Sequence, residues 1–254
     1  MRRAGELGDI QRIGGHSRWV RLTHWTIALA VFVLIFSGLA ILMVHPRFYW
    51  GQAGNDLMRP LFEVPLGPNF HTQQFSAQTP FFAGSGGAAT ADRLAEPWNQ
   101  NGWARSLHFL AAWVFLAGLA AYLTLCALTG HARRRLLPGR GELTGGALGQ
   151  DLRAHLTLPM PSPPPGAPYG LLQKLTYAFI AFLALPLMVL TGVTMSPAIA
   201  ANFPILLDLL GGTQSARTLH FFAFSCIALF LLVHLAMIAL TGPVRHLRAI
   251  ILGA

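Results

Sequence analysis

The chain has 254 residues, of which 54% are hydrophobic and only 11% carry a charged side chain. Its mean hydropathy of +0.51 is too high for an ordinary soluble domain of this length, which excludes that class of protein. The anionic headgroups of a membrane account for the formal net charge of +9, so a nucleic-acid partner is not needed to explain it.

The first apolar stretch covers about residues 22–44 and follows a tail that contains Arg2 and Arg3. It begins roughly twenty residues after the arginines, which is too late for an ordinary signal peptide. It also ends in VHPRFYW, without an Ala-x-Ala cleavage pattern. We therefore expect this stretch to be retained as a membrane span.

Three further apolar stretches follow at about residues 104–128, 171–195 and 216–241. Each is long enough to span a bilayer, because roughly 20 helical residues cross about 30 Å of hydrocarbon. Pro186 predicts a kink within the third stretch. The expected fold class is an all-α membrane protein, with residues 1–254 forming a single domain that is a bundle of four transmembrane helices.

Basic residues indicate the orientation of this bundle. Thirteen of the 18 Lys and Arg residues lie on the side of the two termini, and five lie on the opposite side. Because basic residues concentrate on the cytoplasmic side, both termini are predicted to be cytoplasmic. The chain is then a multi-pass membrane protein, in contact with membrane lipid.

Two long connections join the spans. The external connection, about residues 45–103, is rich in aromatic residues and prolines, so we expect a folded cap or a docking surface. A loop lying at headgroup level as an aromatic belt is the alternative. The cytoplasmic connection, about residues 129–170, contains LPMPSPPPGAPYG, which predicts an extended linker.

Four of the ten histidines lie in or at the mouth of a span: His24, His108, His220 and His234. His220 and His234 are 14 residues apart, which is within about 40° of whole helical turns and about 21 Å of rise. They therefore share one face near opposite membrane surfaces. His108 matches the depth of His220, and His24 matches that of His234. Two pairs at two depths are typical of two bis-histidine haem b groups, with His108 and His220 holding the outer iron and His24 and His234 the inner iron.

Arginines and a glycine accompany these histidines. An arginine three residues before a histidine lies on the same helix face, one turn nearer the water. Arg105 and Arg217 are therefore predicted to hold the carboxylates of the outer haem, and Arg21 those of the inner haem. Snorkelling arginine at a helix end is the alternative interpretation.

Gly38 lies 14 residues after His24, at the depth of the outer pair. A glycine there would let a porphyrin lie against bare helix backbone. Close contact between two helices explains it equally well.

Other membrane sites fit this pattern less well. A zinc site needs three or four ligands in one sphere, whereas these histidines divide between two depths. All nine acidic residues lie outside the spans, which argues against a proton-coupled transporter or an intramembrane protease. His16 is the strongest rival ligand, although it lies on a different helix face from His24.

Several stretches carry a resemblance to a known family: HSRWVRLTHW, ARSLHF, LLQKLTYAFIAF with LTGVTMSP, and SARTLHFFAFSCIALFLLVHLAM. They resemble the bacterial dihaem cytochrome b family, which provides membrane subunits to nickel-iron hydrogenases, formate dehydrogenases and thiosulfate reductases. The two histidines 14 residues apart are the most specific element. The likeness covers all four spans but neither long connection.

The resemblance implies an electron relay without catalytic residues of its own. A periplasmic catalytic subunit, of the molybdopterin oxidoreductase or hydrogenase type, would exchange electrons with the outer haem, and a quinone would react near the inner haem. In related subunits the quinone site lies near the start of the third span, which points to Gln173, Lys174 and Tyr177. Interface anchoring is the alternative role for Lys174 and Tyr177.

Two other functions stay open from the sequence. The first is a stand-alone haem b enzyme, such as a superoxide:quinone oxidoreductase. The second is a structural anchor without redox function, whose histidines bind no haem. The aromatic external connection favours a subunit that docks a partner over the stand-alone enzyme. An absorption spectrum would distinguish the structural anchor from both.

Overall fold

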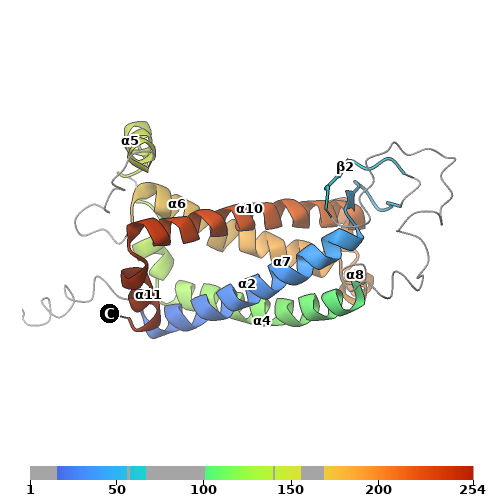
Figure 1. The fold of residues 1–254 in the computed structure, drawn as a ribbon, viewed down its shortest axis with the longest axis horizontal. Helices are drawn as coiled ribbons and strands as arrows, with labels where there is room; N and C mark the ends of the chain where they lie inside the picture. The colour runs from blue at the N-terminus through green and yellow to red at the C-terminus, as the bar shows by residue number, and fades with distance from the viewer. Residues whose placement is uncertain (1–15, 56–57, 67–100, 140, 156–168, 254) are drawn as a thin grey trace, which may run out of the picture. The chain divides into compact units, whose positions relative to one another are not determined.

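The computed structural model describes residues 16–55, 58–66, 101–139, 141–155 and 169–253 (Figure 1). Four helical segments in this part of the chain are long and apolar enough to cross a membrane. They are α2 (Arg18–Val44), α4 (Asn101–Leu128), the segment Leu171–Thr194, and α10 (Thr213–Thr241). The predicted all-α membrane fold with four spans is confirmed, and each span begins at or before its predicted first residue.

The third span is interrupted where the sequence predicts an irregularity. It consists of α6 (Leu171–Phe179), a π-helical stretch η3 (Ile180–Ala184) and α7 (Leu185–Thr194). Pro186 has no backbone N–H to donate to the preceding turn. A π-helical turn directly before it accommodates the lost hydrogen bond within a continuing helix.

The chain divides into two compact units, and each contains a part of every spanning helix. The first unit comprises Met1–Ile27, Ala117–Pro186 and Cys226–Ala254, and the second comprises Ala28–Leu116 and Leu187–Ser225. Large apolar side chains are exposed along all four spanning segments, for example Leu29, Trp113, Leu183 and Leu232. In a membrane such side chains face lipid instead of water.

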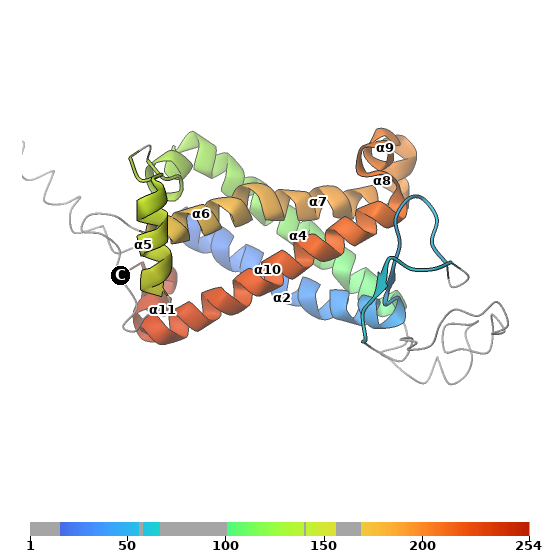
Figure 2. The same ribbon diagram turned by 90° about the horizontal axis from the view of Figure 1, so that it is seen from above.

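The second unit holds a short sheet, formed within the connection between the first two spans, and two short helices. Strand β1 (Arg47–Phe48) pairs antiparallel with β2 (Phe62–Glu63). Helices α8 (Pro197–Asn202) and α9 (Ile205–Leu210) lie side by side after the third span (Figure 2). The described part of the external connection is therefore folded. Residues 67–100, where much of the predicted cap falls, lie outside the described residues.

Hydrogen bonds and an aromatic contact connect residues 45–51 of this connection to the start of α10. The Thr218 hydroxyl donates to Tyr49 O at 2.7 Å, and Gly51 N donates to Ser215 Oγ at 2.8 Å. The side chains of Ser215 and Thr218 are both fully buried. The aromatic ring of Phe48 lies 4.5 Å from that of Phe221, centre to centre. This segment is thus a fixed part of the second unit.

The first unit contains elements that the sequence pattern did not predict. The connection after α4 forms a π-helical stretch η2 (Ala132–Leu136) and helix α5 (Gly145–His155), and the chain ends in helix α11 (Pro243–Ile251). Asp151 Oδ2 on α5 accepts a hydrogen bond from Leu172 N at 2.7 Å and so caps α6. Residues 156–168, which hold most of the predicted proline-rich linker, lie outside the described residues.

Candidate haem-binding site

In the second unit, α4 and α10 bring two histidines together. The ring centres of His108 and His220 are 6.3 Å apart, with the ring planes at 63°. A metal–nitrogen bond is about 2.0 Å, and the centre of a five-membered ring with sides of about 1.33 Å lies about 1.13 Å from each nitrogen. Two imidazoles in line on one metal ion would therefore have ring centres about 6.3 Å apart. The separation fits one iron between the two rings.

The neighbouring helices fix the tautomer of each ring. His108 Nδ1 lies 3.0 Å from Ser37 Oγ on α2, and His220 Nδ1 lies 2.9 Å from Thr191 Oγ1 on α7. Ser37 Oγ donates its proton to Val33 O at 2.7 Å, and Thr191 Oγ1 donates its proton to Leu187 O at 2.8 Å.

A hydroxyl has one proton to donate. Because both hydroxyl protons are used on backbone carbonyls, each histidine must donate its Nδ1 proton to the hydroxyl oxygen. Nε2 of each ring then keeps its lone pair, which is the form that binds a metal ion. Both hydroxyl side chains are fully buried, so water does not compete for these hydrogen bonds.

Each of these hydroxyl residues is followed by a glycine that faces the same histidine. A Cβ atom added to Gly38 would lie 3.4 Å from His108 Cε1, and one added to Gly192 would lie 3.4 Å from His220 Cε1. Gly38 thus lies beside the outer pair, as predicted from its depth. Sequence reasoning missed Ser37, Thr191 and Gly192. The available signal was a hydroxyl residue followed by glycine, which occurs as SG in the first span and TG in the third.

The first unit contains the other two histidines. His24 Nδ1 on α2 is buried without a hydrogen-bond partner among the described residues. The ring of His234 stacks on Phe230 at 5.4 Å, centre to centre. A buried, unpaired ring nitrogen is costly unless it binds something. The role of His24 and His234 as a second pair of axial ligands stays a prediction.

A metal site made of protein ligands alone is not seen in the described part of the chain. No group of three or more His, Cys, Asp or Glu side chains converges there in a way that could hold a metal ion. Paired histidines instead suit an iron whose remaining ligands come from a porphyrin.

Comparison with known proteins agrees with this chemistry. The family described as prokaryotic cytochrome b561 matches residues 15–253. The chain belongs to this family. As a prokaryotic cytochrome b561 it is a multi-pass protein of the bacterial inner membrane, and its cofactor is haem b. The family resemblance noted from the sequence, to bacterial membrane cytochromes b, is confirmed.

The cytochrome is also similar to a protein of Azospira oryzae named as a putative protein-methionine-sulfoxide reductase subunit, YedZ1. The two are 29% identical over 244 residues, which cover 94% of this chain and 96% of that protein. No solved structure matches the chain.

Three arginines were predicted to bind haem carboxylates. In the cytochrome, two of them donate hydrogen bonds to backbone carbonyl oxygens. Arg217 donates through Nη1 to Arg47 O at 2.9 Å and through Nη2 to His45 O, and its guanidinium lies 4.9 Å from the ring centre of Phe48. Arg21 donates through Nη1 to Ile251 O at 2.7 Å. Arg105 is exposed and lies over the ring of Phe109 at 6.0 Å. Their role toward haem stays a prediction.

The residues predicted for the quinone site begin α6 in the first unit. Gln173 Oε1 accepts a hydrogen bond from Gly170 N at 3.1 Å and so caps the helix. Lys174 Nζ is 2.8 and 2.9 Å from the two carboxylate oxygens of Glu142. The ring centre of Tyr177 lies 6.3 Å from that of His234. The structure thus brings one of the three residues beside a candidate haem ligand.

Glu142 is a partner that sequence reasoning missed. The Lys174 side chain is 9% exposed and that of Glu142 is 42% exposed. The buried ammonium group is therefore paired with a carboxylate that is in contact with solvent. The hydrogen bond from Lys174 holds the pKa of Glu142 below its ordinary value. No motif in the sequence signals this pair, because the two residues are 32 positions apart.

Proposed function

We propose that this cytochrome carries electrons across the membrane through two haem b groups. One would be held by His108 and His220 and the other by His24 and His234. The observation that carries the proposal is the 6.3 Å between the ring centres of His108 and His220. Bound haem supplies one-electron oxidation and reduction, and the protein sets its position and potential.

The side chains around His108 and His220 would set the properties of that haem. The Ser37 and Thr191 hydroxyls orient the rings and make them more basic by accepting their Nδ1 protons. Gly38 and Gly192 let the helix backbone lie close to the rings, because a Cβ atom at either position would already touch the ring at 3.4 Å. Buried, apolar surroundings exclude water from the iron.

The proposed orientation would place the two histidine pairs toward opposite sides of the membrane. With both termini in the cytoplasm, His108 and His220 lie toward the periplasm, and His24 and His234 lie toward the cytoplasm. A quinone would exchange electrons near His234, where Tyr177 supplies a hydroxyl for hydrogen bonding to a carbonyl. Gln173 and Lys174 begin the same helix. The ion pair of Lys174 with Glu142 connects this place with water.

A periplasmic oxidoreductase of the molybdopterin type is the partner we propose. The similar protein from Azospira oryzae is named as a reductase subunit, which supports a complex in which catalysis occurs on another polypeptide. Electrons would then pass from the quinone pool to the periplasmic subunit.

Absorbance-monitored redox titration of the purified cytochrome tests the two-haem proposal. The expected result is that His108→Ala and His220→Ala each remove the same b-type component, whereas His24→Ala and His234→Ala each remove the other. His131→Ala is the matched control, because His131 belongs to neither pair and should leave both components. Loss of all absorbance in every pair variant, or of none, would overturn the pairing.

Purification from membranes together with the periplasmic fraction tests the partner. Recovery of a molybdopterin-containing polypeptide supports the complex. A cytochrome that is isolated alone, and that reduces quinone with electrons from superoxide, would contradict the complex and support the stand-alone oxidoreductase instead.

A further inference from the structure

A pocket of about 300 Å³ lies in the first unit between the start of α2 and the C-terminal helix α11. Its lining residues are Arg18, Arg21, Leu22, Trp25, Ile250 and Ile251. Two hydrogen bonds to backbone carbonyls join the helices beside it: Arg21 Nη1 to Ile251 O at 2.7 Å and Trp25 Nε1 to Ile250 O at 3.4 Å. The last turn of α11 is therefore held against α2.

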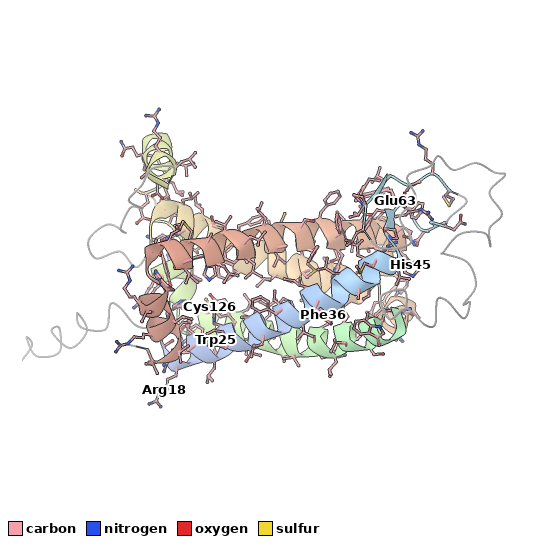
Figure 3. All side chains as sticks on the ribbon, in the orientation of Figure 1. Arg18, Trp25, Phe36, His45, Glu63 and Cys126 are labelled. Atoms are coloured by element: carbon pink, nitrogen blue, oxygen red, sulfur yellow. The ribbon has the colours of Figure 1, made fainter. Side chains whose placement is uncertain are left out.

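Two arginine side chains give the pocket its positive charge. Within the described ranges, neither Arg18 nor Arg21 forms an ion pair with an acidic side chain. Arg21 Nε is buried without a hydrogen-bond partner. Arg18 is exposed and projects away from the helices at the end of α2 (Figure 3). Guanidinium groups bind phosphate through paired hydrogen bonds, so two of them here favour an anionic oxygen ligand.

The rest of the lining is apolar and opens toward lipid. Leu22 is 71% exposed and Ile251 is 52% exposed. Leu22 lies near the start of the spanning helix α2, and Ile251 is the last residue of α11. Trp25 supplies an indole ring, which is typical of the interface between headgroups and hydrocarbon. Arginines beside an apolar wall are suited to bind a molecule with an anionic head group and an acyl chain.

Helix α11 has the character of an interfacial helix. Val244, Leu247 and Ile251 are spaced three and four residues apart and are exposed on one face, whereas Arg245 and Arg248 lie between them in the sequence. A short helix with one apolar and one basic face lies in the plane of the headgroups. This places the pocket at the level of lipid phosphate.

We propose that the pocket binds the phosphate group of an anionic phospholipid, with Arg18 and Arg21 on the phosphate and Leu22, Trp25 and Ile251 along the start of an acyl chain. A haem carboxylate is the competing ligand, since Arg21 lies one turn before His24. Leu22, however, lies two residues before His24 and therefore about 200° around the helix from it. The Leu22 side of the pocket thus faces away from the histidine, whereas the Trp25 ring lies 5.5 Å from the His24 ring, centre to centre. This proposal does not depend on the number of haems or on the electron route.

Native mass spectrometry of the full-length cytochrome, released from nanodiscs of phosphatidylglycerol mixed with phosphatidylcholine, tests the site. The wild-type protein should retain phosphatidylglycerol in preference to phosphatidylcholine. Arg18→Gln and Arg21→Gln should each weaken this retention by about fivefold, because one basic side chain near a membrane surface contributes about 1 kcal/mol. Arg133→Gln, which removes an exposed arginine outside the pocket, should not change it.

Three results would overturn the proposal. One is a double Arg18→Gln and Arg21→Gln variant that retains phosphatidylglycerol as the wild type does. Another is displacement of the lipid by inorganic phosphate alone at an equal concentration, which would indicate a site for small anions. The third is loss of one b-type haem component in Arg21→Gln with unchanged lipid retention, which would assign the guanidinium to a haem carboxylate. Arg18 makes no hydrogen bond to the described residues of α11, so Arg18→Gln keeps the test valid if Arg21→Gln misfolds.

Discussion

Thr191 Oγ1 lies 2.9 Å from His220 Nδ1 and donates its own proton to Leu187 O at 2.8 Å. The hydroxyl therefore acts as an acceptor toward the ring. Ser37 repeats this arrangement with His108 on the other side of the candidate iron position. Two different helices thus fix both rings in the tautomer that leaves Nε2 free to bind metal.

Removal of these hydroxyls should weaken haem binding. In Thr191→Val or Ser37→Ala the histidine loses the partner of its Nδ1 proton, and loss of such a partner costs about 10-fold to 100-fold in metal affinity. The haem-to-protein ratio after purification, or a competition assay with an apo-haem acceptor, measures the change. Thr194→Val is a matched control, since the Thr194 hydroxyl is as buried but donates only to Leu190 O. An unchanged haem affinity in both hydroxyl variants would refute the role of the hydroxyls.

A side chain at Gly192 should disturb the same pair. The Cβ of a residue there would already lie 3.4 Å from His220 Cε1, so the branched atoms of Gly192→Val have no space unless the ring moves. We expect loss of one of two b-type components and retention of the other, measured by redox titration. Gly102→Val is the control, because no atom lies within 4 Å of a Cβ added at Gly102.

The Glu142 and Lys174 pair should make stability depend on pH. The pKa of Glu142 is lowered in the folded protein, chiefly by the Lys174 hydrogen bond. A carboxyl whose pKa is lowered by folding stabilises the protein above its unfolded pKa of about 4.3, and this contribution is lost as the pH falls through the folded pKa. Since Glu142 is 42% exposed, the contribution should be at most about 1 kcal/mol.

Thermal unfolding of the detergent-solubilised protein between neutral and acidic pH measures this contribution. Glu142→Gln should be less stable at neutral pH, because Lys174 Nζ remains buried without its partner. Adding Lys174→Gln to Glu142→Gln should recover part of the loss, as expected for two interacting residues. Equal effects in the single and double variants would contradict a coupled pair.

Arg217 should hold the external segment in place. The Arg217→Gln variant removes the hydrogen bonds to His45 O and Arg47 O, so the amides of residues 45–51 should exchange hydrogen faster than in the wild type. Hydrogen–deuterium exchange with mass spectrometry measures this directly. Arg105→Gln, which removes an exposed arginine, should leave the exchange unchanged. If Arg217→Gln instead shifts a haem potential and leaves exchange unaltered, Arg217 holds a haem carboxylate.

The sequence by itself determined the four spans, and it predicted which histidines form pairs. Span length and apolar composition are local properties, and a spacing of 14 residues on one helix predicts both face and depth without knowledge of the neighbours. Gly38 was placed beside the outer pair for the same reason. The linker and the cap stay predictions, because most of their residues lie outside the described part of the chain.

Only the tertiary structure decided which groups meet across helices. Whether Ser37 or Thr191 reaches a histidine depends on how each helix is rotated in the packed bundle, and one residue changes that direction by about 100°. The Glu142 pair with Lys174, the Arg217 contacts and the pocket beside α11 join residues 32, 172 and 230 positions apart. Such contacts follow from how separate elements pack, which no local pattern in the chain records.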